Sequence, residues 1–186
     1  MPIPEEIVTP GERLEALAIA ELRQERGDIL AGWCPPLVLV VIQPSFRLPV
    51  AYEAVRNRAG LLLGRRTVWR RDVDRERVRA SRAGANVPTE ALVPTFEVAE
   101  GALDEALFQR EVQALAAARI PGFPPVGEMG LDGVTFELAL SAGWVWTRYR
   151  WWVSPPPGWE PLATFVQRFI ELSERAVEVS NSAPPT

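Results

Sequence analysis

The chain has 186 residues and a formal net charge of −4, and all twenty of its basic residues are arginine because it contains neither histidine nor lysine. This length suits one domain, and the absence of histidine excludes Ser-His-Asp and Cys-His catalytic sites and histidine-held metals. The absence of lysine excludes a Walker-type lysine and Schiff-base chemistry.

The first predicted elements are a helix and a buried strand. A helix is expected over residues 10–26, because Thr9 supplies a capping hydroxyl, Pro10 occupies the first helical position and Glu12 completes a capping box. The continuous apolar run over residues 37–43 then predicts a strand that is buried on both faces.

The middle of the chain predicts an alternation of helices and short strands. A second helix is expected over residues 49–60, behind a proline, and a strand over 66–71. Residues 74–82 have a helical pattern that is polar on almost every side. A short strand over 94–98 and a helix over 102–119 complete this part.

The last third of the chain predicts a three-stranded antiparallel meander over residues 126–152. Asp132-Gly133 lies between two apolar runs and is typical of a hairpin turn. A second hairpin turn is predicted at Ala142-Gly143. A helix over residues 159–177 carries apolar residues at helical spacing and is expected to back the meander. We expect a mobile tail over residues 180–186.

The register of the second hairpin decides which side chains share a face. The predicted register pairs Glu137 with Arg148, Phe136 with Tyr149, and Val134 with Trp151. One face is then apolar and is expected to lie under the C-terminal helix. Helices and strands that mix without a steady βαβ repeat favour a single α+β domain over residues 1–179.

The other face of this hairpin is the first candidate functional site. It gathers tryptophan and arginine side chains around one acid, namely Trp144, Trp146, Arg148, Arg150 and Glu137. Tryptophan and arginine are enriched at the hot spots of protein interfaces. The pattern therefore predicts a surface that binds a protein partner. The alternative is that another element, such as the first helix, covers this face and the tryptophans belong to the core.

The second candidate site is a stripe of arginines. Residues 47–82 carry a net charge of +7 against −11 for the remainder, which indicates either an anionic partner or internal charge pairing. Arg71, Arg75 and Arg79 are four residues apart and share one helical side, with Arg82 close by. Guanidinium groups in this arrangement could bind an anion such as phosphate. Internal pairing with neighbouring acids is the preferred interpretation.

Neither the acids nor the single cysteine indicates a metal or covalent site. Asp72, Asp74 and Glu76 could hold Mg²⁺ or Mn²⁺ through their oxygens, but the neighbouring arginines compete for these carboxylates. Cys34 is expected to be a buried apolar residue, since no histidine is present to activate it. We therefore expect no bound metal and no cofactor.

These patterns predict a non-enzymatic protein-interaction module, such as a toxin-neutralising immunity protein or an assembly adaptor of a bacterial system. The acidic amino terminus is unlike a secretory signal and no apolar run is long enough to span a membrane, so a cytoplasmic location is expected. One alternative is a nucleic-acid-associated protein that uses residues 47–82. The other is a carboxylate- and metal-dependent enzyme, and we expect no hydrolase, kinase or transferase turnover in EDTA.

Overall fold

The computed structural model describes residues 9–23, 36–82, 93–122, 132–142 and 145–182. Within these residues the chain forms four helices and six strands. In chain order they are α1 (Pro10–Leu22), β1 (Val38–Pro44), β2 (Val50–Arg56), β3 (Leu62–Trp69), α2 (Arg71–Arg82), β4 (Phe96–Ala102), α3 (Glu105–Ala116), β5 (Val134–Ala142), β6 (Val145–Trp152) and α4 (Glu160–Ser182).

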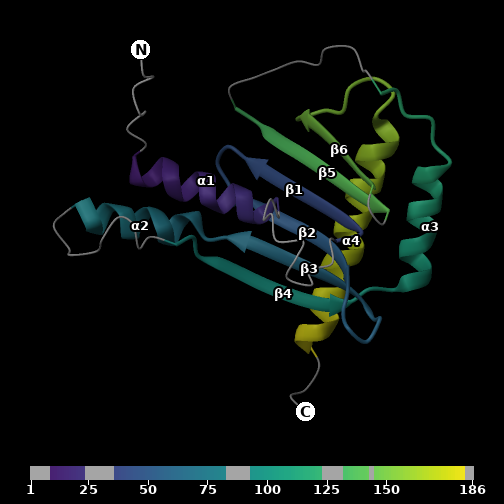
Figure 1. The fold of residues 1–186 in the computed structure, drawn as a ribbon, viewed down its shortest axis with the longest axis horizontal. Coiled ribbons are helices and arrows are strands. Elements are labelled where there is room, and N and C mark those ends of the chain that lie inside the picture. Colours follow the sequence, from purple (N-terminus) through teal and green to yellow (C-terminus); the bar gives the residue numbers. More distant parts are fainter. Residues whose placement is uncertain (1–8, 24–35, 83–92, 123–131, 143–144, 183–186) are drawn as a thin grey trace.

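All six strands belong to one antiparallel sheet with the order β4-β3-β2-β1-β5-β6 (Figure 1). The first four strands follow one another as a meander. The chain then passes through α3 and returns to the free side of β1, where β5 pairs along the whole of that strand. β1 is therefore a central strand, and β4 and β6 are the two edges. The α+β fold expected from the sequence is confirmed.

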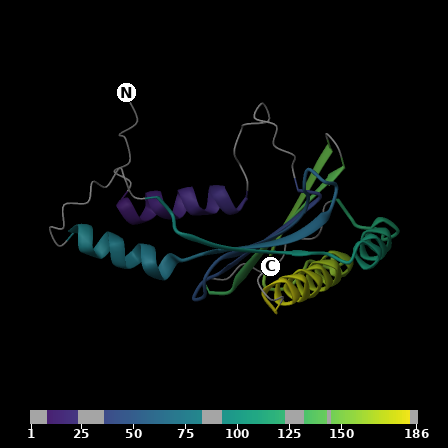
Figure 2. The same cartoon turned by 90° about the horizontal axis from the view of Figure 1, so that it is seen from below.

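The larger core lies between one face of the sheet and helices α3 and α4 (Figure 2). The apolar side of β5 and β6 faces this layer, as predicted, and Leu138 and Trp151 are buried there. From α4, Leu162, Phe165 and Phe169 complete the core. Burial of large apolar side chains on this scale is the main term that stabilises a domain of this size.

The opposite face of the sheet is covered in part by α1. Ala18 and Leu22 of this helix are buried against Leu39, Val41 and Ala139 of the central strands. Farther out, Leu14 of α1 contacts Val78 of α2, so the two helices pack side by side. Both helices extend past the sheet, at the left in Figure 1. This layer is smaller than the layer formed by α3 and α4.

The start of α1 has the predicted cap. The backbone N–H of Glu12 donates to the Thr9 hydroxyl at 3.3 Å, and the Thr9 N–H donates to the Glu12 carboxylate at 2.7 Å. These reciprocal bonds satisfy two of the amide groups that a helix start leaves without partners. The helix ends at Leu22 with Arg23 as its C-cap, and residues 24–26 of the predicted helix lie outside the described residues.

The helix predicted over residues 49–60 is wrong, because this segment forms β2. Tyr52 and Ala54 face the α4 layer, while Ala51 faces the α1 layer. Alanine and glutamate are good helix formers, so local preference gives little warning of a strand here. Pairing with β1 on one side and β3 on the other decides the structure, as tertiary context often does for strands.

The three-stranded meander predicted over residues 126–152 is wrong in its first strand. β5 pairs with β1 along one edge and with β6 along the other, so neither edge is left for the residues before Asp132. Gly133 lies beside Ser45 instead of in a hairpin turn, and its N–H donates to the Ser45 hydroxyl at 3.0 Å. Residues 123–131 lie outside the described residues.

The register predicted for the second hairpin is also wrong, by two residues. Glu137 lies opposite Arg150 rather than Arg148, and Phe136 lies opposite Trp151 rather than Tyr149. This register stacks the Phe136 and Trp151 rings with their centroids 5.6 Å apart, a favourable cross-strand contact. A shift of two residues leaves every side chain on its predicted face. The predicted turn at Ala142-Gly143 is displaced, because Ala142 pairs with Val145, and residues 143–144 lie outside the described residues.

The remaining predicted elements exist with different bounds. α2 begins at Arg71, three residues before the predicted start, whereas α3 is shorter at both ends than predicted. The predicted C-terminal helix is confirmed as α4, and it continues to Ser182, into the stretch expected to be a tail.

A pair of glycines lets α4 approach the sheet closely. Gly64 of β3 and Gly101 of β4 lie opposite each other. A Cβ atom added to Gly101 would lie 2.0 Å from the carbonyl oxygen of Ala176 in α4, which is far inside van der Waals contact. The close packing of α4 on this edge of the sheet therefore depends on glycine at position 101.

Candidate binding surfaces

The first candidate surface, which we call the Trp146 face, consists of Trp146, Arg148 and Arg150 of β6 together with Glu137 of β5. Trp146 is 39% exposed and the Arg150 side chain is 64% exposed. The four residues share the sheet face that the sequence predicted. Trp144, the fifth predicted member, lies outside the described residues.

Glu137 lies at the centre of a group of donors on this face. Arg23 donates to both of its carboxylate oxygens, from Nε at 2.8 Å and from Nη2. Gln43 Nε2 donates to Oε1 at 3.2 Å, and Arg150 Nε lies 3.4 Å from the same oxygen. Because the Glu137 side chain is only 16% exposed, these contacts neutralise a largely buried charge.

Part of the predicted face is covered, as the alternative interpretation of the sequence anticipated. α1 lies over Leu39, Val41 and Ala139, and Arg23 at its end reaches Glu137. Trp146 does not belong to this covered core. Between Arg23, Val41, Arg148 and Arg150 the surface is hollowed by about 200 Å³, which leaves room for one side chain of a partner against the two arginines of this face.

The second candidate surface is a hollow between α1 and α2, which we call the α1–α2 groove. Its volume is about 280 Å³. The apolar lining comes from both helices and from the end of β3, and the charged lining comes mainly from α2. The lining of the groove includes the apolar or small residues Gly11, Leu14, Trp69 and Val78 and the arginines Arg71, Arg75 and Arg79.

Arg71 is held in the structure by its own contacts. Its Nη2 donates to the carbonyl oxygens of Ser45 at 3.3 Å and Arg47 at 3.1 Å, and its guanidinium carbon lies 6.0 Å from the centre of the Trp69 ring. Burial, and then the positive charge of Arg75, lower the pKa of Arg71 below its usual value. Arg71 therefore links α2 to the β1–β2 turn as well as lining the groove.

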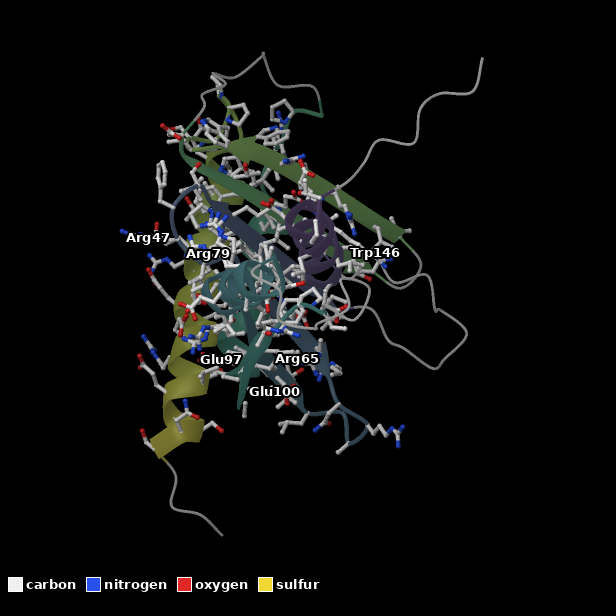
Figure 3. All side chains as sticks on the ribbon, turned by 90° about the vertical axis from the view of Figure 1, so that its left-hand side faces the viewer. Arg47, Arg65, Arg79, Glu97, Glu100 and Trp146 are labelled. Atoms are coloured by element: carbon white, nitrogen blue, oxygen red, sulfur yellow. The ribbon has the colours of Figure 1, made fainter. Side chains whose placement is uncertain are left out.

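Arg75 and Arg79 are exposed, and among the described residues neither makes a hydrogen bond or an ion pair. Arg82, the fourth arginine of the predicted stripe, ends α2, and its side chain is not among those described. In Figure 3, which views the molecule from the outer ends of α1 and α2, Arg79 and Trp146 lie on opposite sides of α1. The two candidate surfaces are therefore separate.

Most of the other arginines of residues 47–82 are paired with acids, as expected from the charge distribution. The ion pairs are Arg56 with Glu105, Arg65 with Glu53 and Glu100, Arg66 with Glu97 and Glu174, Arg70 with Asp72 and Glu97, and Arg77 with Asp74. Arg65 and Glu100 lie opposite each other on β3 and β4, and Figure 3 labels this pair. Internal pairing is thus confirmed for these five arginines, and Arg75 and Arg79 of the groove are not among them.

The acids near α2 are engaged in structural contacts. Asp74 is 2% exposed and accepts hydrogen bonds from the Trp69 indole at 2.8 Å, from the Thr95 N–H at 2.9 Å and hydroxyl at 2.7 Å, and from Arg77 at 3.1 Å. Asp72 pairs with Arg70. Across the described ranges no cluster of three or more potential ligands could hold a metal ion, and Cys34 lies outside those ranges.

Two buried groups have perturbed acidities for structural reasons. Burial alone would raise the pKa of Asp74, but the hydrogen bonds from Thr95, Trp69 and Arg77 outweigh it and lower that pKa below its usual value. Burial, and then the hydrogen bond to Glu174 at 2.5 Å, raise the pKa of Tyr52 far above its usual range. Tyr52 links β2 to α4 and lies outside both hollows.

Arg23 and Gly11 are among the residues of these surfaces that the sequence did not reveal. Arg23 follows the end of an amphipathic helix, and nothing in its neighbourhood indicates a carboxylate 114 residues away. Leu14 is buried where α2 packs on α1, and no sequence pattern indicated that contact.

Comparison of the chain with protein families, with curated proteins and with solved structures finds no match. Within the described part of the chain, no helix combines the length and the apolar character that crossing a membrane requires. Function is therefore argued from the two surfaces.

Proposed function

We propose that this chain is a non-enzymatic protein-interaction module that binds a protein partner through the Trp146 face. The observation that carries the proposal is the exposure of Trp146, 39% of a large aromatic side chain, beside Arg148 and Arg150. Tryptophan and arginine provide a large contact area and directed hydrogen bonds, and for this reason they dominate interface hot spots. The adjacent hollow of about 200 Å³ offers space for a side chain of the partner.

The position of β6 supports the same proposal. β6 is an edge strand, and no described strand pairs with its outer side. An exposed edge can accept a strand from another protein, whose main chain then supplies hydrogen bonds while alternate side chains supply specificity. A partner strand added here would lie directly beside Trp146 and Arg150.

A toxin-neutralising immunity protein or an assembly adaptor in the bacterial cytoplasm would use a surface of this kind. The nucleic-acid alternative has less support, because five arginines of residues 47–82 are already paired with acids. The metal-enzyme alternative has less support because Asp72 and Asp74 are engaged by arginines.

The decisive variant is Trp146→Ala. Biotinylated wild-type protein is used to capture partners from a lysate of the native organism, and the captured protein is then purified and titrated by calorimetry. We expect Trp146→Ala to weaken the measured affinity by about 2 kcal/mol or more, and to change the free energy of unfolding by less than about 0.5 kcal/mol. Val98→Ala is the control, since Val98 is a 56% exposed apolar residue of the other edge strand.

Two results would count against this proposal. A large fall in the melting temperature of Trp146→Ala would place the tryptophan in the core, because truncation of a buried tryptophan costs about 3–5 kcal/mol. A partner that binds wild type and Trp146→Ala equally would show that the contact lies elsewhere on the molecule.

A further inference from the structure

The α1–α2 groove combines uncompensated positive charge with an apolar floor. We infer that it is a second docking site, which takes an acidic, amphipathic segment of a partner protein with its carboxylates on Arg75 and Arg79 and its apolar side chains on Leu14 and Val78. This inference does not depend on the Trp146 face, because the two surfaces lie on opposite sides of α1 (Figure 3).

The charge of the groove favours an anionic occupant. Arg71, Arg75 and Arg79 follow one another at intervals of four on one side of α2, and like charges at this spacing repel each other. Two acids also line the groove, but Asp74 is already held by Trp69, Thr95 and Arg77. Glu15 remains as one carboxylate against three guanidinium groups. A bound anion would relieve this excess of positive charge.

The length of the stripe favours an elongated occupant over a single small ion. Arg79 lies eight positions after Arg71, which corresponds to about 12 Å along a helix at a rise of ~1.5 Å per residue. Carboxylates placed four residues apart on a partner helix have the same spacing as these arginines. A helical segment of two to three turns could therefore span the stripe and pair with Arg75 and Arg79 in register.

The floor of the groove favours a peptide over a nucleic acid. Leu14 is 3% exposed and Val78 is 8% exposed, and together with Trp69 they form an apolar base beneath the arginines. A sugar-phosphate backbone has no apolar side chain to place there, whereas leucine or phenylalanine residues between the acids of an amphipathic helix would bury apolar area.

The binding test uses a defined probe. A fluorescein-labelled helical peptide of about 14 residues, or ~20 Å, carries glutamates four residues apart and leucines on the adjoining side. Fluorescence anisotropy is measured at low and at physiological ionic strength. We expect saturable binding by wild type, and binding weakened at least tenfold, or ~1.4 kcal/mol, in the double variant Arg75→Glu/Arg79→Glu. Arg58→Glu is the matched control, because Arg58 is exposed in the same basic segment and does not line the groove.

A second variant tests the groove itself without altering charge. Gly11 lines the hollow, and a Cβ atom added there meets nothing within 4 Å. The Cβ atom of Gly11→Phe therefore meets no clash, and its ring is expected to fill part of the groove. A melting temperature equal to that of wild type verifies that the fold is retained. We expect it to weaken peptide binding about tenfold, whereas Trp146→Ala should leave peptide binding unchanged.

Several outcomes would overturn the inference. Absence of saturable peptide binding by wild type would do so, as would an equal loss of affinity in Arg58→Glu, which would indicate non-specific attraction. Unaltered binding by Gly11→Phe would show that the peptide does not enter the groove. Tighter binding of a single-stranded oligonucleotide with the same charge as the peptide would assign the site to nucleic acid instead. None of these outcomes bears on the contact proposed for Trp146.

Discussion

Asp74 shows how one buried side chain can organise the junction of three elements. It lies in the first turn of α2, and its carboxylate joins the Trp69 indole at the end of β3 to Thr95 just before β4. A carboxylate that accepts several hydrogen bonds tolerates burial that would otherwise be costly. A metal ligand is one interpretation of this acid from the sequence alone, whereas its contacts in the structure are structural.

The effect of Asp74 on stability should depend on pH. Since its folded-state pKa lies below the usual value, the ionised form stabilises the fold fully above about pH 4, and this contribution is lost as the pH falls through the folded-state pKa. We expect Asp74→Asn to lower the free energy of unfolding by about 2–3 kcal/mol at neutral pH, with the difference from wild type shrinking in acid. Urea denaturation across the acidic range measures this.

Asp72→Asn is the control for that experiment, because the Asp72 side chain is 52% exposed in its pair with Arg70. An exposed pair contributes little, so Asp72→Asn should leave the free energy of unfolding close to that of wild type. A constant difference between wild type and Asp74→Asn at all pH values would contradict the proposed role of the ionised carboxylate.

Gly101 provides a prediction about backbone packing. The Gly101→Ala variant places a Cβ atom 2.0 Å from the Ala176 carbonyl oxygen, so α4 must move away from β4. We expect a loss of about 1–3 kcal/mol or more in the free energy of unfolding, as for other overpacked sites. Gly11→Ala, where the added atom meets open space, should not destabilise the protein. Equal stability of wild type and Gly101→Ala would show that α4 is free to shift.

At the scale of elements, the sequence is most informative where local chemistry determines the structure. The capping box at Thr9 marks the start of α1 correctly, and the apolar run of β1 and the apolar stripe of α4 identify both elements. β2 was missed because Ala51, Glu53 and Ala54 suit a helix when considered alone. Its strand conformation comes from two long-range pairings that no local window contains.

The hairpin of β5 and β6 also combines a feature that local sequence determines with one that it does not. Alternation of apolar and polar side chains determined the faces correctly, because any shift by an even number of residues preserves them. Alternation cannot distinguish registers that differ by two. The contact of Phe136 with Trp151 and the opposition of Glu137 and Arg150 accompany the observed register. The residues that share the Trp146 face could therefore be predicted from the sequence. The residue of β6 that lies opposite each residue of β5 could not.

The attachment of α1 to the sheet through Arg23 can be tested by comparing two arginines. Arg23 and Arg150 both contact Glu137, but Arg23 is 21% exposed and donates to both oxygens, while Arg150 is 64% exposed. We expect Arg23→Ala to cost about 1–2 kcal/mol, since it leaves a largely buried carboxylate with weaker partners. Arg150→Ala should cost less than about 0.5 kcal/mol. Chemical denaturation measures both, and equal costs would contradict this role of Arg23.

At the scale of the whole molecule, the two layers on the sheet differ greatly in the apolar surface that they bury. α4 buries seven of its residues, including Phe165 and Phe169, whereas α1 buries only Leu14, Ala18 and Leu22. The sheet and α4 therefore form the stable part of the molecule. α1 belongs to the less stable part, although it lines both candidate binding surfaces through Gly11 and Arg23.

The smaller number of buried residues in α1 than in α4 should have a measurable effect on native-state hydrogen exchange. Segments with few buried contacts open at lower free energy than the central strands of a sheet. We expect the hydrogen-bonded amides of α1 to exchange at least about tenfold faster than those of β1, which corresponds to an opening free energy lower by ~1.4 kcal/mol. Mass spectrometry of peptides from the two segments measures the difference. Arg23→Ala should accelerate exchange in α1, because Arg23 anchors the end of this helix to Glu137 of β5. Equal protection of α1 and β1 in wild type would show instead that both layers open only when the whole molecule unfolds.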